Sequence, residues 1–262
     1  MSAPPRKRFG QHFLHDPNVI SRIVALIAPG EDDAMVEIGP GQGALTGPLL
    51  ERVHHLHVIE IDRDLIAELE KRPYAERLTI HGGDVLAFDF AGLPARLRVV
   101  GNLPYNISTP ILFHLLGFAT RIVDLHFMLQ KEVVDRMVAA PSTSEYGRLS
   151  VMLQARFEMR KCLDVGAGAF KPPPKVASAI VRLVPKGAAI ELRDEATFAS
   201  VVTAAFTKRR KTLRNALAGW IDVEGLEALG IDAGLRPENL SVADYAAIAN
   251  RITDRERRVT LR

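Results

Sequence analysis

The chain has 262 residues, of which 47% are hydrophobic, and its formal net charge at pH 7 is +3. This length suits one large or two modest domains, and the single cysteine, Cys162, excludes an internal disulfide. No apolar run reaches the roughly 20 residues that cross a bilayer, and the N-terminus lacks the apolar stretch of a signal peptide. We therefore expect a cytoplasmic protein without a membrane segment and, because no heptad repeat is visible, a monomer.

Short apolar runs alternate with helical stretches along the first part of the chain. A helix is expected between Asp16-Pro17, a capping carboxylate followed by proline, and the stop at Pro29-Gly30. This alternation predicts a parallel sheet covered on both faces. The predicted strands are 34–38, 56–61, 78–80, 98–100 and 124–130, the predicted helices are 44–53, 63–71, 110–117 and 131–139, and apolar runs at 149–160 and 176–184 are expected to extend the sheet, as an antiparallel pair at its edge.

A domain boundary is predicted at Pro185-Lys186-Gly187, because the pattern beyond it is helical and rich in alanine. The predicted domains are thus 1–185, which is α/β, and 186–262, which is small and all-helical. Basic residues cluster at Arg6–Arg8 and at Lys208–Arg214. Charge alone leaves two interpretations open, solvated helix faces or contacts with nucleic acid.

A glycine-rich loop, "VEIGPGQGALT" at 36–46, follows a predicted strand and opens a helix. Its glycines allow a tight turn and a close approach of the backbone to a ligand. Glu60 ends the next strand, where a carboxylate can accept hydrogen bonds from ribose hydroxyls. The spacing Gly39-x-Gly41-x-x-Ala44 also satisfies the dinucleotide-binding pattern, and three glycines can serve only a turn, so the loop alone does not identify a cofactor.

Two further polar residues follow the next strands. Asp84 comes just after the third strand of the sheet, where its carboxylate can accept a hydrogen bond from an adenine amino group, and Asn102 ends the fourth. The loop, Glu60, Asp84 and Asn102 thus follow four successive strand ends. Doubly wound folds bind ligands at this edge of the sheet.

The stretch Asn102-Leu103-Pro104-Tyr105 fits N-methylation of a planar amino group. The lone pair of such a nitrogen is delocalised, so the protein needs acceptors that hold the amino hydrogens and favour a pyramidal nitrogen. The side-chain oxygen of Asn102 and the carbonyl of Leu103, kept extended by Pro104, can be these acceptors. Tyr105 offers a face for base stacking; the alternative is a proline turn with Tyr105 in the core.

Several motifs, taken in order, resemble the ribosomal RNA adenine dimethyltransferase family. They are "FGQHFLHD", "VEIGPGQGALT", "VIEID", "GD" at 83–84, "GNLPYNIST" and "FKPPPKVASAIVRL", and they span most of the first 185 residues. The resemblance implies a Rossmann-like methyltransferase fold with S-adenosylmethionine as methyl donor. It also implies N6,N6-dimethylation of two adjacent adenosines in the 3′-terminal hairpin loop of 16S rRNA within the pre-30S particle, and a role in small-subunit biogenesis.

The resemblance also assigns site residues. For methyl transfer they are Asn102, Leu103, Pro104, Tyr105 and Phe170, and for the cofactor they are Gln11, His12, Leu14, Gly39, Gly41, Glu60, Ile61, Asp84, Val85 and Asn102. Position 12 is often asparagine in the family, and the histidine found here can also form a hydrogen bond. Phe170 is expected on the other side of the target base from Tyr105, with core packing as the alternative. No metal site is expected from His54, His55 and His57, which lack further ligands.

Three other functions remain as alternatives. A large-subunit rRNA adenine methyltransferase of the antibiotic-resistance type shares the glycine loop and the Asn-x-Pro-Tyr turn. A ribosome-assembly or nucleic-acid-binding factor could use the fold without catalysis, although the intact set of Gly39, Glu60, Asp84 and Asn102 argues against lost chemistry. A nicotinamide dehydrogenase lacks a visible hydride-transfer partner and does not explain the turn.

Overall fold

The computed structural model describes residues 12–187 and 190–260, and the chain divides into two compact units. The first unit comprises Met1–Val134 and Glu158–Pro185, and the second comprises Asp135–Phe157 and Lys186–Arg262. The chain thus passes into the second unit at 185–186, where the sequence places a domain boundary. The segment Asp135–Phe157, which the sequence analysis assigned to the first domain, groups with the C-terminal residues instead.

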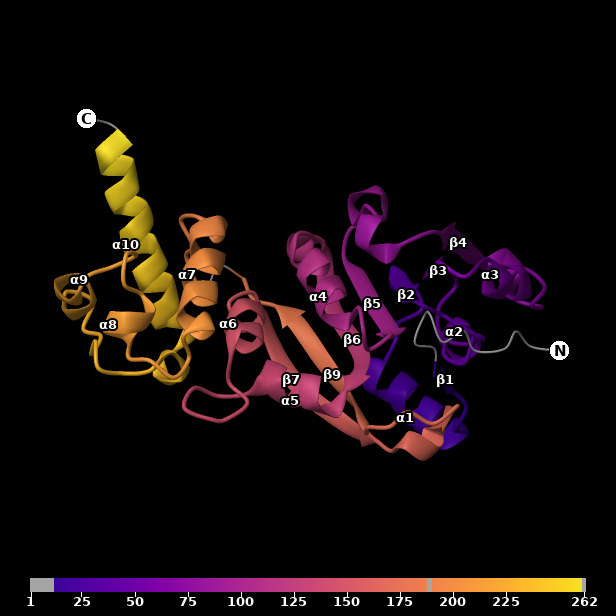
Figure 1. Cartoon of the computed structure of the whole chain (residues 1–262). Coiled ribbons are helices and arrows are strands. Elements are labelled where there is room, and N and C mark those ends of the chain that lie inside the picture. Colours follow the sequence, from indigo (N-terminus) through magenta and orange to yellow (C-terminus); the bar gives the residue numbers. More distant parts are fainter. Residues whose placement is uncertain (1–11, 188–189, 261–262) are drawn as a thin grey trace. The chain divides into compact units, whose positions relative to one another are not determined.

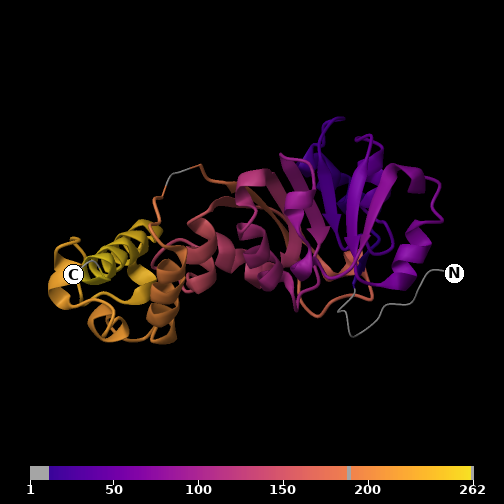
Figure 2. The same cartoon turned by 90° about the horizontal axis from the view of Figure 1, so that it is seen from above.

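The first unit is built on a seven-stranded sheet with the order β4-β3-β2-β5-β6-β9-β7. Five neighbouring strands are parallel, and β9 is antiparallel to β6. In Figures 1 and 2 these strands lie side by side with helices around them. The strands are β2 (Met35–Ile38), β3 (Leu56–Glu60), β4 (Leu78–Gly82), β5 (Leu97–Asn102), β6 (Ile122–Gln130), β7 (Phe157–Val165) and β9 (Ser178–Pro185). The predicted α/β class is confirmed.

The helices of this unit cover a sheet that is buried on both sides. All four residues of β2 are at most 2% exposed, as expected for a central parallel strand. Helices α1 and α2 pack on one face, in a core that includes Ile23, Leu49, Val58 and Val100. The helices of the first part of the chain are α1 (Pro17–Ile27), α2 (Thr46–Leu50), α3 (Arg63–Leu69), α4 (Ser108–Leu116) and α5 (Lys131–Val138).

The start of α1 follows the sequence prediction. The Asp16 carboxylate accepts hydrogen bonds from the backbone N–H groups of Asn18 and Val19, at 2.8 and 3.2 Å, and Pro17 is the first helical residue. Ile23, Val24 and Ile27 face the core. This local signal is strong because the cap and the proline act within one turn of the helix.

The predicted extension of the sheet over 149–160 is wrong in its first half. Residues Arg148–Gln154 form α6, and the strand begins only at Phe157. The Ser150 hydroxyl holds the start of α6, accepting from the N–H of Gly147 at 3.0 Å and donating to the carbonyl of Arg136 at 2.5 Å. A short apolar run does not distinguish a strand from a buried helix, so the tertiary partners decide.

The second unit is helical and has its own core. Phe198, Val201, Val202, Tyr245 and Ile248 are buried together in it. The helical pattern predicted beyond residue 186 is confirmed in outline, but it is interrupted at 208–212, between two helices. The helices after residue 186 are α7 (Glu195–Thr207), α8 (Leu213–Ala216), α9 (Val223–Glu227) and α10 (Val242–Thr260). Within residues 12–187 and 190–260 no helix is long and apolar enough to cross a membrane.

An ion cluster at the start of β5 joins the end of α1 to β5 and β6. The Arg98 guanidinium donates to both carboxylate oxygens of Asp124, at 2.9 and 3.0 Å, and to Asp33 at 2.6 Å. It also donates to the main-chain oxygens of Ile27 and Ala28, at the end of α1. Burial would raise the pKa of Asp124, but the hydrogen bonds and charge of Arg98 hold it below its ordinary value.

Replacing Arg98 by methionine should destabilise the first unit. Arg98→Met leaves the 2%-exposed Asp124 carboxylate with the more exposed Arg182 and the buried His126, whose imidazole lies 3.8 Å away, and breaking such a pair typically costs about 3 to 5 kcal/mol. Urea unfolding followed by circular dichroism measures the change. The control, Arg22→Met on the exposed side of α1, should change the free energy of unfolding by less than about 0.5 kcal/mol. Equal midpoints for the two variants would contradict the structural role of the cluster.

Candidate active site

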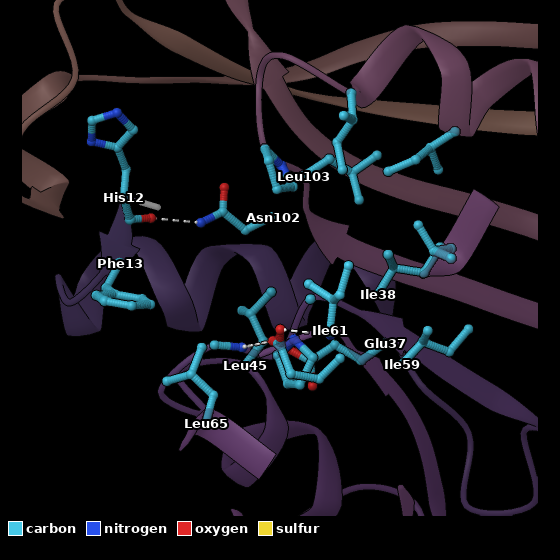
Figure 3. A pocket seen from close by; sticks show the side chains of 18 of the residues that line it. His12, Phe13, Glu37, Ile38, Leu45, Ile59, Ile61, Leu65, Asn102 and Leu103 are labelled. Atoms are coloured by element: carbon cyan, nitrogen blue, oxygen red, sulfur yellow. Dashed lines mark hydrogen bonds between the residues drawn. The ribbon is translucent and has the colours of Figure 1, made fainter. Parts of the chain in front are cut away.

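A cavity of about 300 Å³ lies at the carboxyl ends of β2, β3 and β5, within the first unit. This is the edge at which doubly wound sheets bind ligands. Figure 3 shows apolar side chains such as Ile38, Leu45 and Leu65 around a few polar groups. A largely apolar pocket with a small number of fixed polar groups is typical of a cofactor site.

The glycine loop forms one wall of the cavity. Gly39, Gly41 and Gly43 have φ angles of +66°, +57° and +82°, which side-chain-bearing residues rarely adopt. A Cβ on Gly41 would also lie 3.2 Å from the ring of Phe13. The loop therefore has a conformation that favours glycine, and the backbone of Gly39 and Gly41 lines the cavity, where it can approach a bound cofactor.

Glu60 ends β3 and is held by the backbone around it. Its carboxylate accepts from the N–H groups of Ile61 and Asp62, both at 2.9 Å, and from Gly41 at 3.3 Å. Burial raises the pKa of Glu60, and these three hydrogen bonds oppose the rise. The carboxylate is thus fixed at the rim of the glycine loop, where it can accept hydrogen bonds from a diol.

Glu37 is a second buried carboxylate that lines the cavity. It lies in β2, is 2% exposed, and accepts a hydrogen bond of 2.7 Å from the Thr46 hydroxyl. Burial raises the pKa of Glu37 to about 7, against the Thr46 hydrogen bond, and nearby Glu60 adds to the rise. A positively charged ligand in the cavity would favour the ionised form of both groups.

Asp84, Val85 and Ile61 line another part of the cavity. Asp84 is exposed and caps a short turn by accepting from the N–H of Leu86 at 2.9 Å. Ile61 is 48% exposed, which is unusual for a large apolar side chain, whereas Val85 is 7% exposed. Two apolar side chains next to a carboxylate suit a flat heterocycle with an amino group.

The Asn102–Tyr105 turn begins at the end of β5 and forms the opposite wall. The Asn102 amide donates from Nδ2 to the main-chain oxygen of His12 at 3.0 Å. Leu103 is 1% exposed, and its N–H donates to Met128 on the adjacent strand at 3.2 Å. The Tyr105 hydroxyl is hydrogen-bonded to the Ser178 hydroxyl at 2.6 Å, and burial raises the pKa of Tyr105. The turn is therefore fixed on both sides.

The segment before α1 crosses this end of the sheet. Phe13–Leu14 (β1) pairs with Phe170–Lys171 (β8) as a two-stranded antiparallel sheet. The ring of His12 stacks on Tyr105 with centroids 5.8 Å apart and planes at 28°. Its Nδ1 lies 2.8 Å from the main-chain oxygen of Pro172.

The structure brings all but two of the predicted site residues to this one cavity. Gln11 lies outside the described residues, and Phe170 does not line the cavity. The residues that line it are His12, Leu14, Gly39, Gly41, Glu60, Ile61, Asp84, Val85, Asn102, Leu103, Pro104 and Tyr105. Their individual roles remain predictions.

Phe170 occupies the core position that the sequence analysis held as its alternative. The ring is 2% exposed and belongs to a core with Leu14, Val165 and Ala169. In this conformation it offers no free face to a base. The cause is the pairing of β8 with β1, which turns the residue inward opposite Leu14.

Sequence reasoning missed several residues that line the cavity. The apolar wall includes four residues that the sequence analysis did not single out, although the first three lie inside its motifs: Phe13, Ile38, Leu45 and Leu65. Glu37 did give a signal, because a carboxylate inside an apolar strand just before a glycine loop is seldom placed there for packing.

The histidines of β3 and β4 do not form a metal centre in the part of the chain that the structure describes. His57 Nδ1 and His81 Nε2 are 3.1 Å apart, and His55 bonds to the Thr79 hydroxyl at 2.8 Å. Across the described ranges no group of three or more His, Cys, Asp or Glu side chains could hold a metal ion.

The fold and the cavity define a class of protein, the Rossmann-like methyltransferases that bind S-adenosylmethionine at the strand ends. The particular family follows from comparison with known proteins. The family described as ribosomal RNA adenine dimethylase matches residues 4–254. The chain therefore belongs to this family, is a methyltransferase, and takes its methyl groups from S-adenosylmethionine. The predicted family, fold and cofactor are confirmed, and the dehydrogenase alternative is excluded.

Relatives and solved structures agree with this family. The chain is 63% identical over 248 residues to ribosomal RNA small subunit methyltransferase A of Aromatoleum aromaticum, covering 94% of each. The protein of the same name from Thiobacillus denitrificans is 62% identical, covering 93% of this chain and 96% of that one. The structure of a dimethyladenosine transferase from Plasmodium falciparum has a TM-score of 0.83 at 26% identity, covering 94% and 98%. The structure of the 23S rRNA methyltransferase ErmE has a TM-score of 0.69 at 28% identity, covering 92% and 99%.

The raised pKa of Glu37 predicts a pH-dependent stability. Between pH 4.5 and about 7 the folded protein keeps a proton that the unfolded chain releases, so this group's contribution falls by about 3 kcal/mol as pH rises. In Glu37→Gln the neutral amide still accepts from Thr46, and the loss should disappear. Urea unfolding at pH 5 and pH 8 measures it. The exposed-site control Glu51→Gln should keep the wild-type dependence, and the same dependence in Glu37→Gln would refute the assignment.

Proposed function

We propose that the protein transfers methyl groups from S-adenosylmethionine to the N6 atoms of two adjacent adenosines in the 3′-terminal hairpin loop of 16S rRNA. The product is N6,N6-dimethyladenosine at both positions, which requires four transfers. The observation that carries the proposal is the Asn102–Tyr105 turn, which shares one cavity with the glycine loop. The 63% identity to a protein named for small-subunit rRNA supports the choice of substrate.

The cavity residues fit S-adenosylmethionine, which supplies a methyl group on a positively charged sulfur. Glu60, already fixed by three backbone N–H groups, would hold the ribose hydroxyls. Asp84 would accept from the adenine amino group, with Ile61 and Val85 against the ring. The backbone at Gly39 and Gly41, which lines the cavity, would approach the remainder of the cofactor.

The turn would prepare the target nitrogen. The Asn102 side-chain oxygen and the Leu103 carbonyl would accept the two amino hydrogens and favour a pyramidal nitrogen whose lone pair points at the methyl carbon. As the new N–C bond forms, the C–S bond breaks and its electron pair stays on sulfur. The nitrogen then releases a proton to solvent, so the step needs no strong base from the protein.

The second unit would contact rRNA. Lys208, Arg210, Lys211 and Arg214 are exposed around the start of α8, and exposed cations favour phosphate. Arg209 in the same cluster pairs with Glu238 at 2.8 Å. We therefore propose the pre-30S particle as the partner. We also propose the cytoplasm as the location and a monomer as the working form. Arg6–Arg8 lie outside the described residues.

The first test uses labelled S-adenosylmethionine and small ribosomal subunits that lack dimethyladenosine. The wild type should yield labelled N6,N6-dimethyladenosine, whereas Asn102→Ala should lose at least 100-fold in rate because one acceptor is gone. Cofactor affinity measured by calorimetry should stay within a few-fold in Asn102→Ala. Asn18→Ala, on an exposed turn of α1, is the control and should keep the wild-type rate.

The outcome also separates two functions. The match to the structure of ErmE, a 23S rRNA methyltransferase, covers 99% of the ErmE chain. A large-subunit rRNA adenine methyltransferase is therefore the second candidate. If the wild type binds the cofactor and labels only large-subunit RNA, the small-subunit assignment fails. If it labels neither RNA, the proposal fails for both substrates.

Tyr105 should contribute through its ring rather than its hydroxyl. Tyr105→Ala removes a stacking surface worth about 1 to 3 kcal/mol, so the rate at low subunit concentration should fall by about 5- to 150-fold. Tyr105→Phe keeps the ring and loses only the bond to Ser178, so we expect less than a tenfold loss. Steady-state kinetics with Ser178→Ala as the matched control separates the two effects. An equal loss in Tyr105→Phe and Tyr105→Ala would rule out stacking.

A further inference from the structure

The orientation of the Asn102 amide is fixed by its partner. Its Nδ2 lies 3.0 Å from the main-chain oxygen of His12. A carbonyl oxygen only accepts hydrogen bonds, so the amide must present its N–H group there and its oxygen elsewhere. The chemistry of the partner therefore determines which end of the amide faces which way.

The other end of the amide is available. Figure 3 shows the Asn102 oxygen on the side away from the dashed bond to His12. Among the residues that the structure describes, Oδ1 has no hydrogen-bond partner, although Asn102 lines the cavity. An unengaged acceptor at this place is what the amino group of a target adenine requires.

His12 is itself held from both sides, so its carbonyl is a fixed point. The β1–β8 pairing anchors the next two residues, Leu14 is 6% exposed, and the N–H of His15 donates to Ala169 at 2.9 Å. The His12 ring donates from Nδ1 to the oxygen of Pro172, which also only accepts. Residues 12–15 are thus fixed in place next to the end of β5.

We propose that the main-chain carbonyl of His12 is a positioning group for methyl transfer. It accepts the Asn102 Nδ2 hydrogen and so holds Oδ1 toward the substrate amino group. This rests on the proposed function, in which Asn102 is an acceptor, and it adds a requirement: position 102 must donate on one side while it accepts on the other.

The requirement predicts that a carboxylate is a poor substitute for the amide. A carboxylate is a stronger acceptor than an amide, so it would serve if acceptance were the only need. It has no hydrogen for the His12 carbonyl, and its oxygen would face that oxygen at about the 3.0 Å now occupied by a hydrogen bond. Mutual repulsion would turn the group away from the His12 carbonyl, so its oxygen would no longer be held toward the substrate amino group.

The experiment compares methyl transfer to small subunits by the wild type, Asn102→Asp and Asn102→Ala between pH 6 and pH 8. At pH 8 we expect Asn102→Asp to be at least 100-fold slower than the wild type and close to Asn102→Ala. The variant-to-wild-type ratio of Asn102→Asp should then rise toward pH 6, because the protonated fraction of the carboxyl group, which alone can donate to His12, increases as the pH falls. The other titratable residues of the cavity are present in both the wild type and Asn102→Asp, so the variant-to-wild-type ratio is the readout. They are His12, Glu37, Glu60, Asp84 and Tyr105.

A measurement without substrate checks the contact itself. In protein carrying ¹⁵N-asparagine, the Asn102 side-chain amide should show a nuclear Overhauser effect to the Hα of His12, assigned by its loss in Asn102→Ala. A missing effect overturns the inference, as does Asn102→Asp activity within threefold of the wild type at pH 8. If the wild type itself does not methylate small subunits, the proposed function fails instead, while the amide contact is still tested by this measurement.

Discussion

The close approach of β5 to β2 at Gly101 is the constraint on which the active site depends. A Cβ at Gly101 would lie 2.6 Å from the main-chain oxygen of Ile38, a distance that no side-chain-bearing residue tolerates. Glycine there lets the two strands end side by side, so Gly39 follows one and Asn102 the other. The cofactor loop after β2 and the methyl-transfer turn after β5 therefore meet in one cavity because Gly101, next to the end of β5, has no side chain.

Electrostatics reinforce this geometry. The cavity is lined by two carboxylates, Glu37 and Glu60, whose pKa values burial raises. Burying such groups costs stability, and a cationic ligand offsets that cost. At the start of β5 a buried carboxylate is neutralised instead, since the Arg98 guanidinium pairs with Asp124 and joins the end of α1 to the sheet. The Arg98 cluster thus stabilises the sheet, whereas the buried carboxylates Glu37 and Glu60 favour binding of a cation in the cavity.

Sequence patterns predicted well wherever the deciding interaction was local. The Asp16 cap, the alternation of strands and helices, and the glycine loop each act within a few residues, so their signals survive without tertiary information. The run at 149–160 was misread because a short apolar segment is compatible with either a strand or a buried helix. The core position of Phe170 could not be decided from sequence either, since it depends on pairing with β1, more than 150 residues earlier.

The sequence by itself determined the family, the cofactor and the order of the polar residues along successive strand ends, because each motif is contiguous. Only the tertiary structure decided how those residues face one another. It brought the carbonyl of His12 to the amide of Asn102 across 90 residues, and it placed Glu37 against Thr46 beside the cavity. Such contacts depend on how strands and helices pack, which local propensity and periodicity do not encode.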